Sequence, residues 1–158
     1  MTTLKSILVA VDFSEASRAA VEHGLELAKA FNASLHLLHV VDEPLRKTWA
    51  GYTPCAEFLE TVDRLRTEAR KRLEQLVPRT ELGDGRIVVA TAWGDPSDEL
   101  LKYVRSHDID LIVCGTHGRR GWDHFTMGSV AERVVRVSSC PVLTVRAAAQ
   151  RGGVGTAA

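Results

Sequence analysis

Uninterrupted runs of apolar residues recur along this chain, separated by longer segments in which apolar residues are spaced three or four apart. The first run, residues 6–11, is apolar at nearly every position and is followed by Asp12. Such runs are typical of strands that are buried on both faces, as in a parallel sheet between two layers of helices. The pattern predicts strands at residues 6–11, 35–41, 86–92, 110–114 and 142–145.

The intervening segments have the spacing and the end signals of amphipathic helices. Ser14 is a suitable N-cap for a helix that reaches about Phe31, because a hydroxyl at this position accepts a hydrogen bond from the first turn. Asp95, followed by a proline, begins another helix that ends near His107. Two further helices are expected, a long one between the loop at residues 42–54 and Pro78, and a short one at residues 129–137.

Strands and helices therefore alternate in the order β-α-β-α-β-α-β-α-β. This order predicts an α/β fold: a single doubly wound domain with a five-stranded parallel sheet, helices on both faces and right-handed crossovers. No internal repeat or linker divides the chain, so we expect one domain over residues 1–146. Small and polar residues dominate from Ala147 onward, and residues 147–158 are expected to form a disordered tail.

The charge balance bears on possible partners. The 158 residues contain 20 basic and 20 acidic side chains, which gives a formal net charge of zero. Such a chain has no general field to attract nucleic acid or an anionic membrane, so neither is an expected partner. Met1 leads directly into the first strand without a signal-peptide pattern, and Cys55, Cys114 and Cys140 are widely dispersed. These features favour a cytoplasmic protein with reduced thiols.

Open parallel sheets bind ligands beyond the carboxyl ends of their strands, so the residues that follow the strands are the candidates for function. The most unusual such segment begins at Gly115 and contains Arg119 and Arg120. Glycine permits positive φ and close backbone approach, so the amides of this segment could form a nest for an anion. The pair Gly128–Ser129 opens a helix, whose positive end favours phosphate. A surface turn before an ordinary Ser N-cap is the alternative, but the complete spacing favours phosphate binding.

The spacing of this segment, Gly115-x2-Gly118-x9-Gly128-Ser129, matches the nucleotide motif Gly-x2-Gly-x9-Gly-[Ser/Thr] of the universal stress protein family. Segments at residues 5–14, 128–134 and 140–145 also resemble that family's first strand, closing helix and last strand. The resemblance implies the strand order 3-2-1-4-5, which the residues alone do not choose over a flavodoxin-like order. Because every motif glycine is present, the chain is similar to the branch of the family that binds ATP.

The resemblance also implies roles for individual residues. Asp12 would contact the ribose or a Mg²⁺ ion bound to phosphate, and the backbone of Val40 would contact the adenine. Ala10 stands where some relatives have proline, which bears on the shape of the adenine pocket. The ATP site as a whole would comprise Ala10, Asp12, Val40, Gly115, Gly118, Arg119, Gly128, Ser129 and Val130. The family likeness further implies a homodimer through the strand Val142–Val145, an apolar sheet edge that would pair with its twin.

Three functions remain open on the sequence. The first is an ATP-binding regulatory or stress-response module, in which nucleotide occupancy alters conformation or partners. The second is a slow enzyme that hydrolyses ATP or phosphorylates itself, and the third is a dimeric interaction protein with a vestigial pocket. The chain has no Gly-x4-Gly-Lys-[Ser/Thr] loop and no Gly-x-Ser-x-Gly elbow. Since no base is evident beside the glycine segment, rapid ATP hydrolysis is not expected.

Two expectations concern residues outside the proposed site. His36 and His39 are three residues apart on one strand, so their side chains should lie on opposite faces of the sheet rather than form a pair. Cys114 ends an apolar strand and should be a buried filler of the core.

Overall fold

The computed structural model describes residues 4–42, 56–78, 85–116 and 127–147 of the chain. Five strands form one sheet, and all four neighbouring pairs are parallel. The strands are β1 (Ser6–Ala10), β2 (Ser34–Val41), β3 (Ile87–Trp93), β4 (Leu111–Gly115) and β5 (Val142–Val145). The helices of the described part are α1 (Glu15–Phe31), α2 (Ala56–Glu74), α4 (Pro96–Ser106) and α5 (Ser129–Val137). Gly118, Arg119 and the tail from residue 148 lie outside the described residues.

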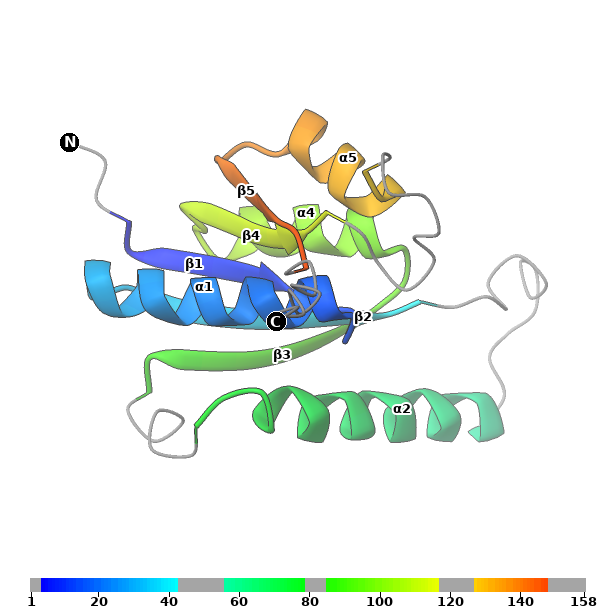
Figure 1. Ribbon diagram of the computed structural model, residues 1–158. Helices are drawn as coiled ribbons and strands as arrows, with labels where there is room; N and C mark the ends of the chain where they lie inside the picture. The colour runs from blue at the N-terminus through cyan, green and yellow to red at the C-terminus, as the bar shows by residue number, and fades with distance from the viewer. Residues whose placement is uncertain (1–3, 43–55, 79–84, 117–126, 148–158) are drawn as a thin grey trace, which may run out of the picture.

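The strands are ordered β3-β2-β1-β4-β5, which confirms the order implied by the family resemblance (Figure 1). Helices cover both faces, so the sheet is doubly wound. Ile7 and Val9 of β1 belong to the core on the side of α1 and α2, and Leu8 belongs to the core on the side of α4 and α5. This double burial explains the uninterrupted apolar runs. None of the described helices is long and apolar enough to cross a membrane.

The strands end close to their predicted positions at the carboxyl edge of the sheet. β1 ends at Ala10, one residue earlier than predicted, although the Val11 amide still donates to the Leu38 carbonyl of β2 at 2.9 Å. β4 runs one residue further than predicted and includes Gly115, which is paired with β5. Gly115 is therefore the last residue of a strand, and the loop begins after it.

His36 and His39 lie on opposite faces of β2, as their spacing predicts. His36 Nδ1 forms a hydrogen bond of 2.9 Å with Tyr103 Oη of α4, whereas His39 Nδ1 lies 2.7 Å from the Val11 carbonyl oxygen. Both histidines are buried, and the rings of His36 and His107 lie 5.9 Å apart between centroids. Burial, and then the charge of His107, lower the pKa of His36 from its ordinary value. His36 is thus a neutral core residue at pH 7.

We expect acid to destabilise the fold through His36. Because its pKa is lower in the folded chain, the unfolded chain takes up the proton first, and stability falls as the pH drops below about 6.5. His36→Gln keeps a hydrogen-bonding group but does not titrate, so its melting temperature should fall less than that of the parent between pH 7 and pH 5. His23→Gln, at an exposed position on α1, is the control. Its melting temperature should fall between pH 7 and pH 5 as much as that of the parent. An equal fall in melting temperature for all three proteins would contradict this account.

Candidate functional site

The parallel sheet brings the predicted site segments to one edge. β1 pairs with β2 on one side and with β4 on the other, so that Ala10 lies between Leu38 and Cys114 in the register. The chain runs outward from β1 through β2 to β3, and in the other direction from β4 to β5. The boundary between β1 and β4 is therefore the reversal point, where sheets of this kind form a crevice for ligands. Asp12 and Gly115 leave the sheet on the two sides of that boundary.

A backbone hydrogen bond fastens the start of α5 to the end of β4. The Gly128 amide donates to the Thr116 carbonyl at 2.7 Å, and the Thr116 amide donates to the Val145 carbonyl at 2.8 Å. Thr116 and Gly128 therefore lie side by side beyond the end of β4. The pair Gly128–Ser129 consequently lies at the exit of β4, where the motif spacing predicts a phosphate site.

The first turn of α5 has backbone donors without helical acceptors. The first bond within the helix runs from the Glu132 amide to the Gly128 carbonyl, which leaves the amides of Ser129, Val130 and Ala131 outside the ladder. No side chain caps this helix, and within the described ranges the amides of Ser129 and Val130 have no hydrogen-bond partner. Ser129, which carries a hydroxyl, is also exposed. Such a helix end attracts anions.

The other two helix starts that the structure describes in full are capped by their own side chains. Ser14 accepts from the Ser17 amide at 3.2 Å at the start of α1, and Asp95 accepts from the Asp98 amide at 3.0 Å at the start of α4. Both N-caps were predicted from the sequence. The start of α5 therefore differs from them in having no side-chain cap.

Two of the motif glycines have structural roles of their own. Neither Gly115 nor Gly128 has a positive φ, so the left-handed conformations of an anion nest do not occur at these two positions. The Gly128 amide is already bonded to Thr116, so this glycine positions α5 rather than offering a donor. At Gly115 a Cβ atom would lie 2.8 Å from Ala16 Cβ and 3.1 Å from the Ser17 nitrogen of α1. Gly115 is thus required by the close approach of α1 to β4.

Asp12 is held in a tight turn between β1 and α1. Its Oδ1 atom accepts hydrogen bonds from the Ser14 amide at 3.0 Å and the Ser14 hydroxyl at 2.5 Å. Phe13, between them, has a φ of 65°, which is unusual for a bulky residue and is typical of constrained functional turns. The Phe13 ring packs against His39, and Arg72 of α2 lies 3.8 Å over it. The turn chemistry expected of an Asp before a Ser N-cap is therefore present, and it orients this carboxylate.

The three apolar residues of the predicted site share one face of the sheet. Val40 is buried in the core under α4 and α5, and Ala10 and Val130 pack against the same cluster while remaining partly exposed. These side chains belong to β2, β1 and α5, which the sequence separates widely. The fold therefore gathers three of the predicted site residues on one face of the sheet.

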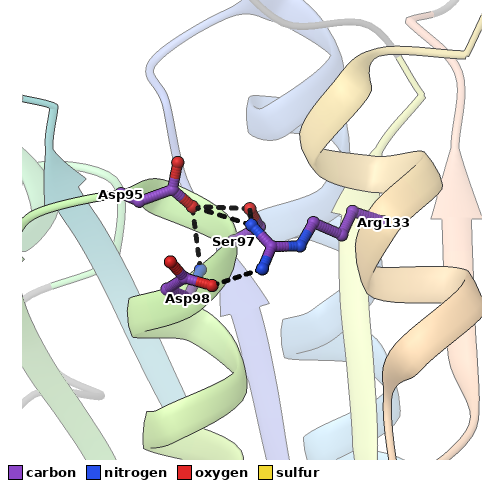
Figure 2. Close-up of polar contacts among 4 residues, drawn as sticks. All are labelled: Asp95, Ser97, Asp98 and Arg133. Atoms are coloured by element: carbon purple, nitrogen blue, oxygen red, sulfur yellow. Dashed lines mark hydrogen bonds and ion pairs between the residues drawn. The ribbon is translucent and has the colours of Figure 1, made fainter.

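A cluster of four polar residues joins α4 to α5 at this edge, and sequence reasoning missed it (Figure 2). Arg133 Nη1 donates to Ser97 Oγ at 3.0 Å and lies 3.4 Å from Asp95 Oδ1, and Arg133 Nη2 lies 2.5 Å from Asp98 Oδ1. The hydrogen bond from Ser97, followed by that from the Asp98 amide, lowers the pKa of Asp95. The helix start at Asp95 was visible in the sequence, but its partner on α5 was not.

One thiol and one carboxylate at this edge bear on the chemistry of the site. Burial raises the pKa of Cys114 to about 11, so its thiol is protonated at neutral pH and is not a nucleophile. The part of the chain that the structure describes holds no group of three or more His, Cys, Asp or Glu side chains able to bind a metal ion. Mg²⁺ commonly takes one or two carboxylates and completes its shell with substrate phosphates and water, a role that suits a single Asp12.

A small hollow lies at the opposite, amino edge of the sheet. It has a volume of about 120 Å³ and is lined by Lys29 and Ala33 near the end of α1 and by Arg86 before β3, among others. Pockets for ligands of drug-like size usually measure roughly 300–1,000 Å³. This hollow is therefore too small to compete with the carboxyl edge as a nucleotide site.

Comparisons with known proteins agree with the fold and the motif. The profile of the universal stress protein family matches residues 3–146. Universal stress protein MJ0531 of Methanocaldococcus jannaschii is 30% identical over 142 residues, which cover 90% of this chain and 82% of that protein. The structure of universal stress protein UspA from Lactobacillus plantarum superimposes with a TM-score of 0.75 at 27% identity, over 92% of this chain and 100% of that one.

Two more distant structures share the fold and contain adenine nucleotides. A universal stress protein in complex with cAMP has a TM-score of 0.60 at 23% identity, over 92% of this chain and 99% of that one. A family member from Arabidopsis thaliana with AMP bound has a TM-score of 0.61 at 20% identity, over 96% and 97%. At these identities the likeness to this chain is one of fold.

We expect Gly115→Ala to destabilise the protein, because the added Cβ would meet backbone atoms of α1 that cannot rotate away. Overpacking of this kind costs about 1–3 kcal/mol of the free energy of unfolding, measurable by urea denaturation. Ala16→Gly removes the nearest atom, Ala16 Cβ at 2.8 Å. The cost of Gly115→Ala should therefore be smaller in the double variant than in the parent. An unchanged stability in the single variant would show that α1 does not press on Gly115.

Proposed function

The chain belongs to the universal stress protein family, and on that premise we propose that it is a regulatory module that binds ATP at the carboxyl edge of its sheet. The observation that carries the proposal is the hydrogen bond between Gly128 and Thr116, which holds the uncapped start of α5 at the exit of β4. A helix start with unpaired amides, held at the reversal point of a parallel sheet, has the position and the polarity that a phosphate group requires.

The phosphate chain of ATP would bind at the start of α5. The amides of Ser129 and Val130 point along the helix axis as donors, and the Ser129 hydroxyl adds a third polar group. Gly118 and Arg119, which lie outside the described residues, would complete this side with close backbone approach and a positive charge. The Gly128 amide remains bonded to Thr116 and serves to place the helix.

The nucleoside would bind between β1 and β2, next to the phosphate chain. Val40, near the end of β2, would contact the adenine through its backbone, with Ala10 and Val130 forming apolar walls. Asp12 would contact the ribose, or a Mg²⁺ ion carried in on the phosphates. The AMP and cAMP present in two structures of the same fold support an adenine nucleotide as the ligand class.

A regulatory role follows from the chemistry available at this edge. Among the described ionisable groups there, Asp12 and Asp95 are used as turn and cap acceptors, Asp98 is paired with Arg133, and Cys114 is protonated. Binding without rapid turnover lets occupancy report the nucleotide supply, and the change in occupancy would alter the conformation or the partners of the protein. With a balanced charge and without a thiol pattern for disulfides, we assign this role to the cytoplasm.

We expect the purified protein to bind Mg-ATP. Two variants should separate the contribution of the Ser129 hydroxyl from that of the backbone at Gly118. Ser129→Ala removes one hydroxyl, and since a hydrogen bond to a charged group contributes about 1.5–3 kcal/mol, affinity should fall roughly ten- to hundredfold. Gly118→Val should reduce affinity further by blocking the approach of the backbone to phosphate. Calorimetric titration gives the dissociation constants, and far-UV circular dichroism checks the fold.

The control for these titrations is Ser139→Ala, an exposed serine that precedes β5 at the opposite edge of the sheet. It should bind ATP like the parent. Mass spectrometry of the supernatant from heated protein would show whether an adenine nucleotide copurifies. A folded Gly118→Val variant that binds ATP as tightly as the parent would overturn the proposed site, and a parent that binds no ATP would overturn the proposed function.

We also propose that the protein forms a homodimer through β5. This strand is at the end of the sheet order, and the side chain of Leu143 is 39% exposed on it. Leu143→Asp should convert a dimer into a monomer in sedimentation velocity at micromolar concentration, because a charge there opposes edge pairing. Val88→Asp, on the opposite edge strand β3 and 37% exposed, is the matched control and should leave the dimer intact. A monomeric parent would refute the dimer.

A further inference from the structure

The guanidinium of Arg133 bridges the starts of two helices. It is on α5, four residues after Ser129, and it reaches the first turn of α4 at Asp95, Ser97 and Asp98 (Figure 2). Three contacts of 2.5–3.4 Å, to two carboxylates and a buried hydroxyl, give this side chain one defined orientation. Asp95 is itself held by the Ser97 hydroxyl at 2.6 Å and by the Asp98 amide at 3.0 Å.

The first turns of α5 are consequently attached at two points. The Gly128 amide ties the helix start to Thr116 after β4, and Arg133, about one turn later, ties it to α4. The donors of Ser129 and Val130 lie between these two attachments in the sequence. A nine-residue helix has little core contact of its own, with only Ala131 and Val134 buried, so its placement depends strongly on such ties.

We infer that Arg133 is a positioning residue for nucleotide binding, which acts through Asp95 and Asp98 to hold the phosphate-binding amides of Ser129 and Val130 in place. This inference rests on the proposed function. Hydrogen bonds prefer donor angles above about 150°, so a tilt of α5 misaligns several amide contacts at once. Arg133 itself does not contact the phosphate.

The exposure of the cluster to water separates this role from a purely structural one. The side chains of Arg133, Asp95 and Asp98 are 44%, 41% and 55% exposed. Ion pairs this accessible to water contribute little to global stability. Loss of the cluster should therefore leave the fold intact and appear mainly in the affinity for the nucleotide.

The charge of Asp98 provides a test in which positioning and simple electrostatics predict opposite signs. Asp98→Asn removes a negative charge near the carboxyl edge, and by Coulomb's law alone this change should strengthen the binding of an anion. If Asp98 acts by holding Arg133, the same change weakens the contact between Arg133 and Asp98 and so weakens binding. The direction of the change in affinity therefore decides between a positioning role and simple electrostatics.

The experiment compares Mg-ATP dissociation constants of the parent, Asp98→Asn, Arg133→Ala and Arg136→Ala. Arg136 is on the same helix, is 72% exposed and lies 4.0 Å from Glu132 of its own helix, so its removal is a matched loss of charge. We expect Asp98→Asn and Arg133→Ala each to weaken binding about three- to tenfold, a cost of roughly 0.6–1.4 kcal/mol, with Arg136→Ala within about twofold of the parent. Unchanged or tighter binding by Asp98→Asn would overturn the inference and leave the proposed function standing.

Amide hydrogen exchange in the absence of nucleotide tests the same inference independently. The reporters are the amides of Gly128, bonded to Thr116, and of Glu132, bonded to Gly128. Both should exchange faster in Asp98→Asn and Arg133→Ala than in Arg136→Ala. Exchange equal to that of the control would overturn the positioning role, even if affinity fell. If the parent binds no ATP, the proposed function fails and the exchange rates alone decide whether the cluster holds α5.

Discussion

The parallel pairing of β1 with β4, from Ile7 opposite Leu111 to Ala10 opposite Cys114, determines where every other part of the site lies. It places the turn at Asp12 beside the exit of β4, although about a hundred residues separate them in the chain. The pairing is itself maintained by burial on both faces, where alternate residues of β1 pack under α1 and α2 or under α4 and α5. Removal of this apolar surface from water is the main favourable contribution to the fold.

At the carboxyl edge of this sheet, a few polar contacts set the positions of the turns and helix starts. Asp12 and Ser14 form the turn into α1, the bond between Gly128 and Thr116 places α5, and Arg133 connects α5 to α4. None of these contacts contributes much to stability, because each exchanges a hydrogen bond to water for one within the protein. Their effect is to hold donors and acceptors at defined positions. Preorganisation of this kind would lower the cost of binding the proposed nucleotide.

The sequence predicts local features well and distant contacts poorly. Apolar runs identify all five strands, and Ser14 and Asp95 identify two helix starts, since such signals depend on neighbours in the chain. The strand order came only from the family resemblance, because the residues are equally compatible with another doubly wound order. The tie from Arg133 to Asp98 joins positions 35 residues apart and leaves no local pattern. The sequence predicts an anion nest in the segment that begins at Gly115, whereas the close approach of α1 to this glycine becomes apparent only in the folded chain.

The central claim is that the unpaired amides at the start of α5 bind the phosphates of ATP. The most direct test is a titration of isotopically labelled protein with Mg-ATP, followed through the backbone amide resonances. The account predicts that Ser129 and Val130 show the largest changes among the residues of α5, and that the exposed serine at position 139 shows none. Saturable shifts confined to other parts of the molecule, such as the hollow beside Lys29 and Arg86, or no shifts at the start of α5 at saturating ATP, would contradict it.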